Sequence, residues 1–352
     1  MKILLVTETP PGTPNGFGVT LKCLFHKTPH KVLYTDAEFK NHGEKEGYLL
    51  AQVPYHPARR HFLSFKMGNI PEWRGNFSSK WLKRHLNEPY GKVFAFVYSI
   101  DCLYYADWIA QQIKTPLIVH IADHCDSFEH KSAVSVMQKC NKLICITEKM
   151  KSKYESVLGR KDIEVLHNGA EENCFNLPSS SPASFDKENP LRLCFIGGLF
   201  SHLHGECIED VVEAVRLFRL DRAFMEFHLY GQRNPACFGK EIFSQSGIKH
   251  HGIVMPLEKK FQIMEEAHCF IIPSSFNEDN HRCYRFSFPT KLPELIATGK
   301  PIISYGPRDT ATNRLLENNS IGIRIHNRSI KCITDALTSI ANQYPEILKK
   351  NQ

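Results

Sequence analysis

Short apolar segments recur along the whole chain, and helix-length stretches separate most of them. In the first half the apolar segments cover residues 3–7, 31–34, 93–98, 116–121, 143–147 and 163–166. In the second half they cover residues 191–196, 224–229, 268–272, 301–305 and 322–325. Buried strands that alternate with helices are typical of parallel sheets. The pattern therefore predicts an α/β protein with two doubly wound, Rossmann-like parallel-sheet domains, whose shared cleft is the default place for a ligand.

A polar stretch between the two halves predicts the domain boundary. Residues 176–186 are rich in Ser and Pro and nearly free of large apolar side chains, which is typical of a linker. We expect a first domain over 1–176, a linker over 177–189 and a second domain over 190–328. Apolar residues then follow helical spacing until Pro345 interrupts them. This predicts a C-terminal helix within 329–352 that leaves its domain and crosses back over the first.

The composition is that of an ordinary globular protein. The chain has 352 residues, of which 42% are apolar and 23% charged, and no apolar run is long enough to cross a bilayer. The first apolar stretch is too short for a signal peptide, so we expect a cytoplasmic protein. The 12 cysteines include no Cys-x-x-Cys pair, and the 18 histidines lack companion ligands at metal spacing. We therefore expect reduced thiols, no metal and no cofactor.

The net charge of +7 suits anionic partners such as nucleotide or lipid phosphates. Residues 56–66 and 80–85 mix basic and aromatic side chains. Such a mixture can hold an anionic acceptor or make peripheral contact with the inner face of a membrane, although solvated charge above buried aromatics is commoner. The same segments are compatible with an enzyme that modifies nucleic-acid bases. The modest net charge argues against extended contact with a phosphate backbone, so nucleic acid is not an expected partner.

The most informative stretch covers residues 288–303, where one cation and one carboxylate flank the start of a short helix that ends at Gly299. Free N–H groups at a helix start, with Lys291 beside them, can hold a diphosphate without a metal. Glu294, one turn further along, can accept hydrogen bonds from the two hydroxyls of a ribose. The plain alternative is an amphipathic helix followed by a buried strand.

Other strand ends carry weaker candidates. Gly16 and Gly18 follow the first strand, and Gly197 and Gly198 follow the first strand of the second half, so backbone can approach a phosphate closely at both places. Arg233 could reach a phosphate or a base. Plain βα loops and a surface arginine are the alternatives, and the glycine pattern lacks the third glycine of a dinucleotide fingerprint.

Two polar loops suit carbohydrate. In residues 120–128, His120 and Asp123 belong to a cluster of imidazoles and carboxylates that can position a sugar hydroxyl or relay its proton. In residues 275–285, Asn277 and Glu278 offer the dense hydrogen bonding that carbohydrate hydroxyls need. The second loop would equally suit a solvated surface.

Taken in order along nearly the whole chain, these segments resemble the GT-B glycosyltransferases, and most of all family 4, which contains retaining, nucleotide-sugar-dependent enzymes of surface-polysaccharide and lipid-linked glycan synthesis. The Pro-Thr-Lys-Leu-x-Glu segment at 289–294 is the most specific. The resemblance implies that Lys291 and the amide of Leu292 hold the donor diphosphate, and that Glu294 holds the ribose. It also places Gly16 or Gly18 near the phosphates, and His120 near the sugar and the acceptor.

Two departures from the family pattern matter. Many members carry a second glutamate at the position of Phe286, so Asn277 or Glu278 would contact the sugar here instead. Many members also clamp the diphosphate with an arginine and a lysine where this chain has Gly198 and His204. Either Lys291 and backbone amides carry most of the phosphate binding, or donor affinity is weak, or activity has been lost.

The sequence thus predicts a glycosyltransferase that moves a sugar from a nucleoside diphosphate sugar to a glycan or lipid-linked hydroxyl acceptor, with retention of configuration. His120, Asp123 and Lys291 are the expected catalytic residues, with Lys291 stabilising the leaving diphosphate. Two alternatives stay open. One is a nucleotide-sugar epimerase on the same fold, and the other is a catalytically silent nucleotide-sugar-binding protein or subunit.

Overall fold

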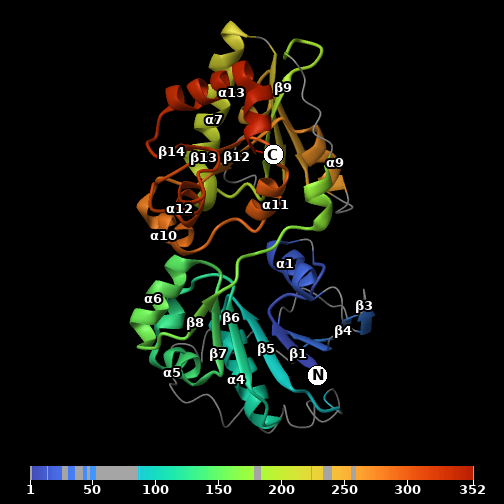
Figure 1. Cartoon of the computed structure of the whole chain (residues 1–352), viewed down its shortest axis with the longest axis vertical. Helices are drawn as coiled ribbons and strands as arrows, with labels where there is room; N and C mark the ends of the chain where they lie inside the picture. Colours follow the sequence, from blue (N-terminus) through green and yellow to red (C-terminus); the bar gives the residue numbers. More distant parts are fainter. Residues whose placement is uncertain are drawn as a thin grey trace. The chain divides into compact units, whose positions relative to one another are not determined.

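The computed structural model describes residues 2–13, 15–25, 31–35, 43–45, 48–52, 86, 88–177, 184–222, 224–232, 240–254 and 259–351. The chain divides into two compact units, Met1–Asn168 and Gly169–Gln352. Each unit is built on its own mainly parallel sheet with helices around it (Figure 1). The α/β class with two doubly wound sheets, predicted from the alternation of strands and helices, is confirmed.

The sheet of the first unit has β1 near its centre, between β2 and β5. The strand order is β3 (Gly43–Lys45), β4 (Tyr48–Gln52), β2 (Lys31–Tyr34), β1 (Ile3–Thr7), β5 (Lys92–Val97), β6 (Leu117–Ile121), β7 (Lys142–Cys145), β8 (Ile163–Val165). All neighbours pair in parallel except β3 with β4. The helices are α1 (Gly16–Phe25), α4 (Ile100–Gln112), η2 (Asp126–Glu129), α5 (Lys131–Lys139) and α6 (Glu148–Leu158).

The sheet of the second unit is parallel throughout. Its order is β11 (Ile248–Gly252), β10 (Met225–Tyr230), β9 (Leu191–Ile196), β12 (Cys269–Pro273), β13 (Ile302–Tyr305), β14 (Ile323–Ile325). Its helices are η3 (Glu172–Asn176), α7 (Ser201–Asp221), α8 (Lys240–Phe243), α9 (Lys259–Glu266), α10 (Glu278–Phe286), α11 (Leu292–Ala297), α12 (Ala311–Asn318) and α13 (Ile330–Asn351).

Successive residues of a strand face opposite sides of a sheet, so the central strands of the second unit supply two cores. Leu193 and Ile271 face α7 and α13, whereas Cys194 and Phe270 face α9 and α11. Strands buried on both faces are continuously apolar, which is why the hydrophobic pattern located them correctly.

Three strands of the structure are absent from the sequence prediction: β3, β4 and β11. Each lies at or next to a sheet edge, and β11 contains Lys249, His250 and His251. An edge strand keeps one side open to solvent, so it does not require the apolar run that marks a central strand.

The C-terminal helix α13 packs beside α7 in the second unit (Figure 1). Its apolar side chains from Ile333 to Leu348 are buried in the same core, although Pro345 lies within that length. The division into units also assigns residues 169–176 to the second unit, ahead of the expected linker. The predicted crossing of the last helix to the first domain stays a prediction.

A buried carboxyl group ends the central strand of the first unit. Glu8 directly follows β1 and is only 5% exposed. One oxygen, Oε1, accepts hydrogen bonds from the backbone N–H groups of Tyr98 (3.0 Å) and Ser99 (2.7 Å), at the start of α4. The other oxygen, Oε2, is buried and has no hydrogen-bond partner among the described residues. Burial raises the pKa of Glu8 to about 7, although the two backbone hydrogen bonds lower it.

This shift predicts a pH-dependent stability. The pKa of Glu8 is about 7 in the folded protein, and its ordinary value is 4.5. The folded state therefore binds the Glu8 proton more tightly than the unfolded state does. This proton binding stabilises the fold fully below pH 4.5, and the stabilisation is lost as the pH rises to about 7. We expect Glu8→Gln, which stays neutral, to gain about 3 kcal/mol in unfolding free energy relative to the wild type between pH 4.5 and pH 8. Urea unfolding across this range measures the difference.

The matched control is Glu188→Gln, because Glu188 is exposed and makes no ion pair among the described residues. Its difference from the wild type should vary little with pH. If the unfolding free energy of Glu8→Gln relative to the wild type also varied little with pH, the raised pKa assigned to the buried Glu8 carboxyl group would be contradicted.

Candidate functional site

The carboxylate of Glu294 is buried in the second unit and bound to a lysine. Glu294 lies in α11 and is 3% exposed, between the buried side chains of Leu292 and Leu295. Its Oε1 accepts a hydrogen bond from the Nζ of Lys260 at 2.8 Å. Lys260 comes from α9 and is 6% exposed. The predicted ribose ligand is therefore part of a buried ion pair.

A second carboxylate completes this group. Glu171, just before η3, accepts a hydrogen bond from the same Nζ of Lys260 at 2.5 Å. Burial lowers the pKa of Lys260, but the two glutamates more than offset it, and the net pKa is raised. Lys260 is thus firmly protonated and is shared between two acidic groups. The sequence analysis missed both Lys260 and Glu171.

A signal for Lys260 was present in the sequence. Lys260, Met264 and Ala267 follow the i, i+4, i+7 spacing of the buried stripe of a helix, and all three are buried. A lysine in such a stripe requires a partner for its charge. The sequence shows the unusual position, but it does not show which acidic residue the lysine meets.

Lys291 is the cation next to this pair. It occupies the N-cap of α11 and is half-buried, and its ammonium makes no hydrogen bond or ion pair within the described part of the chain. Burial lowers the pKa of Lys291, and Lys260 adds to this effect while Glu294 opposes it. An anion bound at the ammonium would relieve that burial cost.

The first amides of α11 are less available than the sequence suggests. The N–H of Leu292 donates to the carbonyl of Pro289 at 2.9 Å, and Pro293 has no N–H. The amide of Leu292, expected to bind the diphosphate, is therefore already hydrogen-bonded within its own turn. The side chain of Lys291 is the remaining strong donor at this place.

Lys300 shows the contrasting case of a buried lysine that is fully engaged. Its Nζ donates to the carbonyls of Met264 (2.8 Å), Glu265 (2.5 Å) and Ala267 (2.6 Å), at the end of α9. Burial lowers its pKa to about 8. Lys300 thus caps a helix, because cations stabilise the carbonyl end.

The glycines after β9 and β10 allow close packing of protein atoms. A side chain at Gly198 would start 2.2 Å from the ring of Phe200, and one at Gly231 would start 1.8 Å from the carbonyl oxygen of Gly197. Gly231 also has a φ of 150°. The ring of Phe200 therefore fills the position where the resemblance expects an arginine.

His204, at the other expected position of the basic clamp, is part of the fold. It is buried, and its Nδ1 donates to the carbonyl of Pro273 at 3.0 Å. The neighbouring Glu206 accepts hydrogen bonds from the N–H of Phe276 (2.9 Å) and the hydroxyl of Ser275 (3.0 Å). The start of α7 thus fixes the loop after β12.

Asn277 and Glu278 follow that loop on the surface of the second unit. The side chain of Asn277 caps α10 by accepting from the N–H of Asp279 at 2.9 Å, and Glu278 is exposed in the first turn. Because β9 and β12 are adjacent and parallel, Gly197, Gly198 and Asn277 lie near the same edge of the sheet. Arg233 lies outside the described residues.

In the first unit, Gly16 and Gly18 begin α1. The N–H of Gly18 donates to Oδ1 of Asn15 at 2.8 Å, and its carbonyl accepts from the N–H of Gly12 at 2.9 Å. A side chain at Gly18 would start 2.6 Å from Cβ of Thr13, so this position requires glycine for the loop itself. A role near donor phosphates stays a prediction.

His120 is a strand residue whose ring is sealed in the first unit. His120 is 1% exposed and lies opposite Phe96 of β5. The two rings pack edge to face, with their centroids 5.0 Å apart. Neither ring nitrogen has a hydrogen-bond partner within the described ranges, although the backbone of Leu166 lies near. Burial lowers the pKa of His120 to about 4, so the ring is neutral at pH 7.

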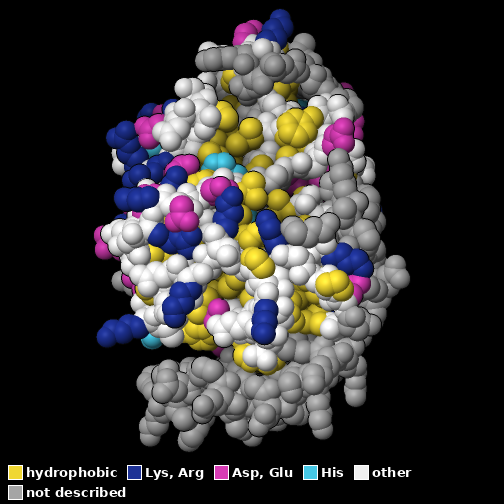
Figure 2. Space-filling model, turned by 60° about the horizontal axis from the view of Figure 1, so that its bottom comes forward, with side chains coloured by type: hydrophobic (Ala, Val, Ile, Leu, Met, Phe, Trp, Pro, Cys, Tyr) yellow, Lys and Arg dark blue, Asp and Glu magenta, His cyan; other side chains and the backbone are white. Residues whose placement is uncertain are grey.

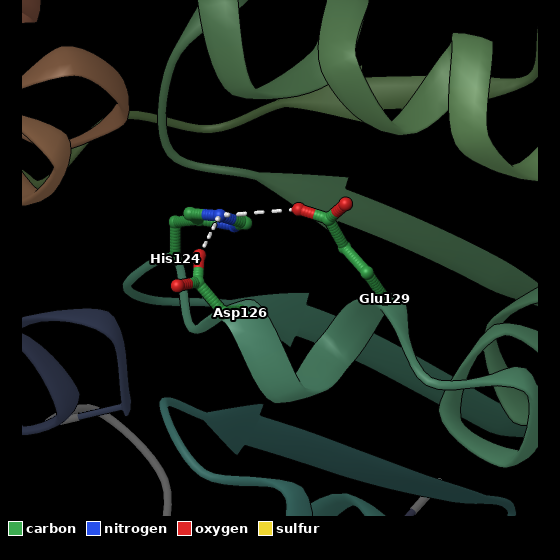
Figure 3. Close-up of side chains that lie close together, drawn as sticks. All are labelled: His124, Asp126 and Glu129. Atoms are coloured by element: carbon green, nitrogen blue, oxygen red, sulfur yellow. Dashed lines mark ion pairs between the residues drawn. The ribbon is translucent and has the colours of Figure 1, made fainter.

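Asp123 follows β6, and its Oδ1 accepts from the N–H of His124 at 2.8 Å. Figure 3 shows the neighbouring cluster, in which Asp126 and Glu129 point toward His124. The distances from Nε2 of His124 to their oxygens are 3.5 Å and 3.6 Å. Of the imidazoles and carboxylates expected to cluster in residues 120–128, His124 and Asp126 meet here together with Glu129, whereas the ring of His120 is buried in the sheet.

The three side chains have a donor set that suits a divalent cation. However, the Nζ of Lys153 lies 2.7 Å from the same Glu129 oxygen that faces His124, and both carboxylates are exposed. The ammonium of Lys153 already pairs with Glu129, so the arrangement is an ion-pair network. The expectation that no metal takes part in function stays a prediction.

The basic and aromatic segments 56–66 and 80–85 lie outside the described residues. On the face drawn in Figure 2, Lys and Arg side chains are mixed with acidic and uncharged ones. No helix among the described residues combines the length and the apolar character needed to cross a membrane.

No protein-family model and no curated protein matches this sequence. Solved structures do match its fold. HepE of Anabaena in complex with UDP has a TM-score of 0.67 at 15% identity, covering 100% of this chain and 94% of its own. A glycosyltransferase from Rickettsia africae has a TM-score of 0.65 at 14% identity, covering 99% and 90%.

A third similar structure is the UDP-GlcNAc 2-epimerase from Neisseria meningitidis bound to UDP-GlcNAc. Its TM-score is 0.60 at 14% identity, and the match covers 100% of this chain and 94% of the epimerase. At such identities the likeness establishes the architecture alone. The chain has the GT-B fold, which glycosyltransferases and an epimerase both use.

Proposed function

We propose that this chain is a glycosyltransferase that transfers a sugar from a nucleoside diphosphate sugar to a hydroxyl acceptor. The observation that supports this most is the placement of Lys291 beside the buried Glu294 at the start of α11. The similar HepE structure contains UDP, and a further one contains UDP-glucose. The ammonium of Lys291 can bind a diphosphate, and the carboxylate of Glu294 can accept hydrogen bonds from ribose hydroxyls.

In the proposed reaction, the bond between the anomeric carbon of the sugar and the diphosphate breaks, and negative charge develops on the leaving diphosphate. A bond from the acceptor hydroxyl oxygen to the anomeric carbon forms, and the hydroxyl proton passes to the leaving diphosphate. The ammonium of Lys291 stabilises that charge, and a donor held in place reduces the entropic part of the barrier. Glu294 accepts hydrogen bonds from the ribose hydroxyls and so fixes the nucleoside end.

Lys291 has to supply most of the diphosphate binding in this proposal. Phe200 fills the space beside Gly198, and His204 donates to a backbone carbonyl, so neither position adds a cation. The hydrogen-bonded amide of Leu292 adds little. The chain would therefore depend on a single lysine to an unusual degree.

The finer parts of the proposal concern the acceptor side. Its low pKa keeps the ring of His120 neutral, so one ring nitrogen can donate to a sugar hydroxyl and the other can accept. Both nitrogens are sealed in the described structure, so a side chain above them would have to move first. A role for Asp123, retention of configuration, a glycan or lipid-linked acceptor, and a cytoplasmic enzyme with peripheral membrane contact complete the proposal.

A nucleotide-sugar epimerase is the second candidate, because an epimerase shares the fold. A silent nucleotide-sugar binder is the third, because the basic clamp is missing. Incubating the full chain with a panel of nucleotide sugars, with and without hydroxyl acceptors, separates the three. A transferase forms a glycosylated acceptor, an epimerase changes the sugar without an acceptor, and a silent binder does neither. NMR of the product's anomeric carbon tests retention.

The first prediction concerns Lys291→Met. Loss of the Lys291 ammonium should lower kcat/KM by about 100-fold to 1,000-fold, because charge stabilisation in the transition state is lost. Steady-state kinetics with the preferred donor measure the change. Lys259→Met, which removes an exposed lysine of α9, is the matched control and should leave the rate within about twofold. A similar rate for both variants would remove Lys291 from the mechanism.

The second prediction concerns Glu294→Gln. Replacing the ribose acceptor should weaken binding of the nucleoside diphosphate by about tenfold to 100-fold, because charge-assisted hydrogen bonds are lost. The variant should fold, since Lys260 keeps Glu171 as a partner. Isothermal titration calorimetry measures the affinity. Glu265→Gln, an exposed position nearby, should bind normally, and undiminished binding by Glu294→Gln would contradict the ribose assignment.

A further inference from the structure

Lys260 holds one oxygen of Glu294 and leaves the other available. Oε1 of Glu294 accepts from Nζ of Lys260 at 2.8 Å. The other oxygen, Oε2, makes no hydrogen bond among the described residues. A small part of its surface stays exposed to solvent. Oε2 is therefore the oxygen of Glu294 that is left to accept a hydrogen bond, while Lys260 keeps the carboxylate in a fixed orientation.

The ion pair with Lys260 also offsets the cost of burying the charged carboxylate of Glu294. A carboxylate that is only 3% exposed is strongly disfavoured in its charged form unless a cation lies beside it. Lys260 is the cation in direct contact, because Lys291 interacts with Glu294 only over a longer range. Without Lys260, the buried carboxylate of Glu294 would have no cation in direct contact among the described residues.

Lys260 is itself held from a second side. An oxygen of Glu171 lies 2.5 Å from the Nζ of Lys260. Glu171 is near the start of the second unit, so this ion pair links the start of the unit to α9. With one carboxylate on each side, the ammonium has little freedom to turn away from Glu294. The three residues Glu171, Lys260 and Glu294 form a chain of charges that ends at Oε2.

We propose that Lys260 is a positioning residue that fixes Glu294 and thereby makes the site selective for ribonucleoside diphosphates over their 2′,3′-dideoxy counterparts. This inference rests on the proposed nucleotide-sugar function. The ammonium of Lys260 binds Glu294 and Glu171, so in this proposal its effect on the ribose passes entirely through Glu294. Ligands without the two hydroxyls should not sense its loss.

The experiment compares two ligands on the full chain by calorimetry. UDP, GDP and ADP are tested first, and the best binder is then compared with its 2′,3′-dideoxy form. The wild type should bind the ribonucleotide about tenfold to 100-fold more tightly, as expected for hydrogen bonds to a charged group. Lys260→Met should lose this preference while its affinity for the dideoxy form stays within about twofold.

Matched variants test whether the effect is specific. Lys260→Arg keeps a charged donor and should keep most of the preference, and Lys259→Met on the same helix should keep all of it. Lys260→Met leaves Glu294 without its partner and can lose stability for that reason. The double variant Lys260→Met with Glu294→Gln removes both charges, and it should discriminate no worse than Glu294→Gln alone.

Several outcomes would overturn the inference. Equal weakening of both ligands by Lys260→Met would show a general structural role. An unchanged preference would show that Lys260 does not act on the ribose. Additive losses in the double variant would show that Lys260 acts independently of Glu294. A wild type that binds ribo and dideoxy forms equally well would refute this inference alone, whereas a wild type that binds no nucleoside diphosphate would refute the proposed function as well.

Discussion

The second unit depends on a buried ion pair at the start of α11. Moving an unpaired carboxylate out of water is costly, and an ammonium in direct contact offsets that cost. Glu294 meets this requirement through Lys260, which a second carboxylate, Glu171, holds in turn. Because α9, α11 and the segment before η3 all contribute, the charge network also ties three separate parts of the chain together.

Three buried or half-buried lysines surround this region, and their contacts assign them different roles. Lys300 donates to three carbonyls and caps α9, while Lys260 joins two carboxylates. Lys291 has neither kind of contact within the described residues and keeps its charge available. The same residue type thus serves helix stability, side-chain positioning and the proposed ligand binding, according to what each ammonium meets.

In the first unit, two buried titratable groups, Glu8 and His120, have no opposite charge in contact among the described residues, and burial shifts the pKa of each toward its neutral form. Burial raises the pKa of Glu8 to about 7 and lowers that of His120 to about 4. In each case burial opposes the charged form and no opposite charge restores it.

The sequence by itself determined the fold class, because strands buried on both faces must be continuously apolar and helices must alternate with them. It also singled out Lys291 and Glu294, whose positions depend on a local helix start. It did not reveal Lys260 as the partner of Glu294, since the two are 34 residues apart and meet only when α9 and α11 pack on one face of the sheet. Nor did it show that Phe200 fills the space beside Gly198, or that the amide of Leu292 is already bonded. Local patterns depend on neighbours along the chain, whereas partners for buried charges and space for side chains depend on neighbours in three dimensions, and only the tertiary structure brings those together.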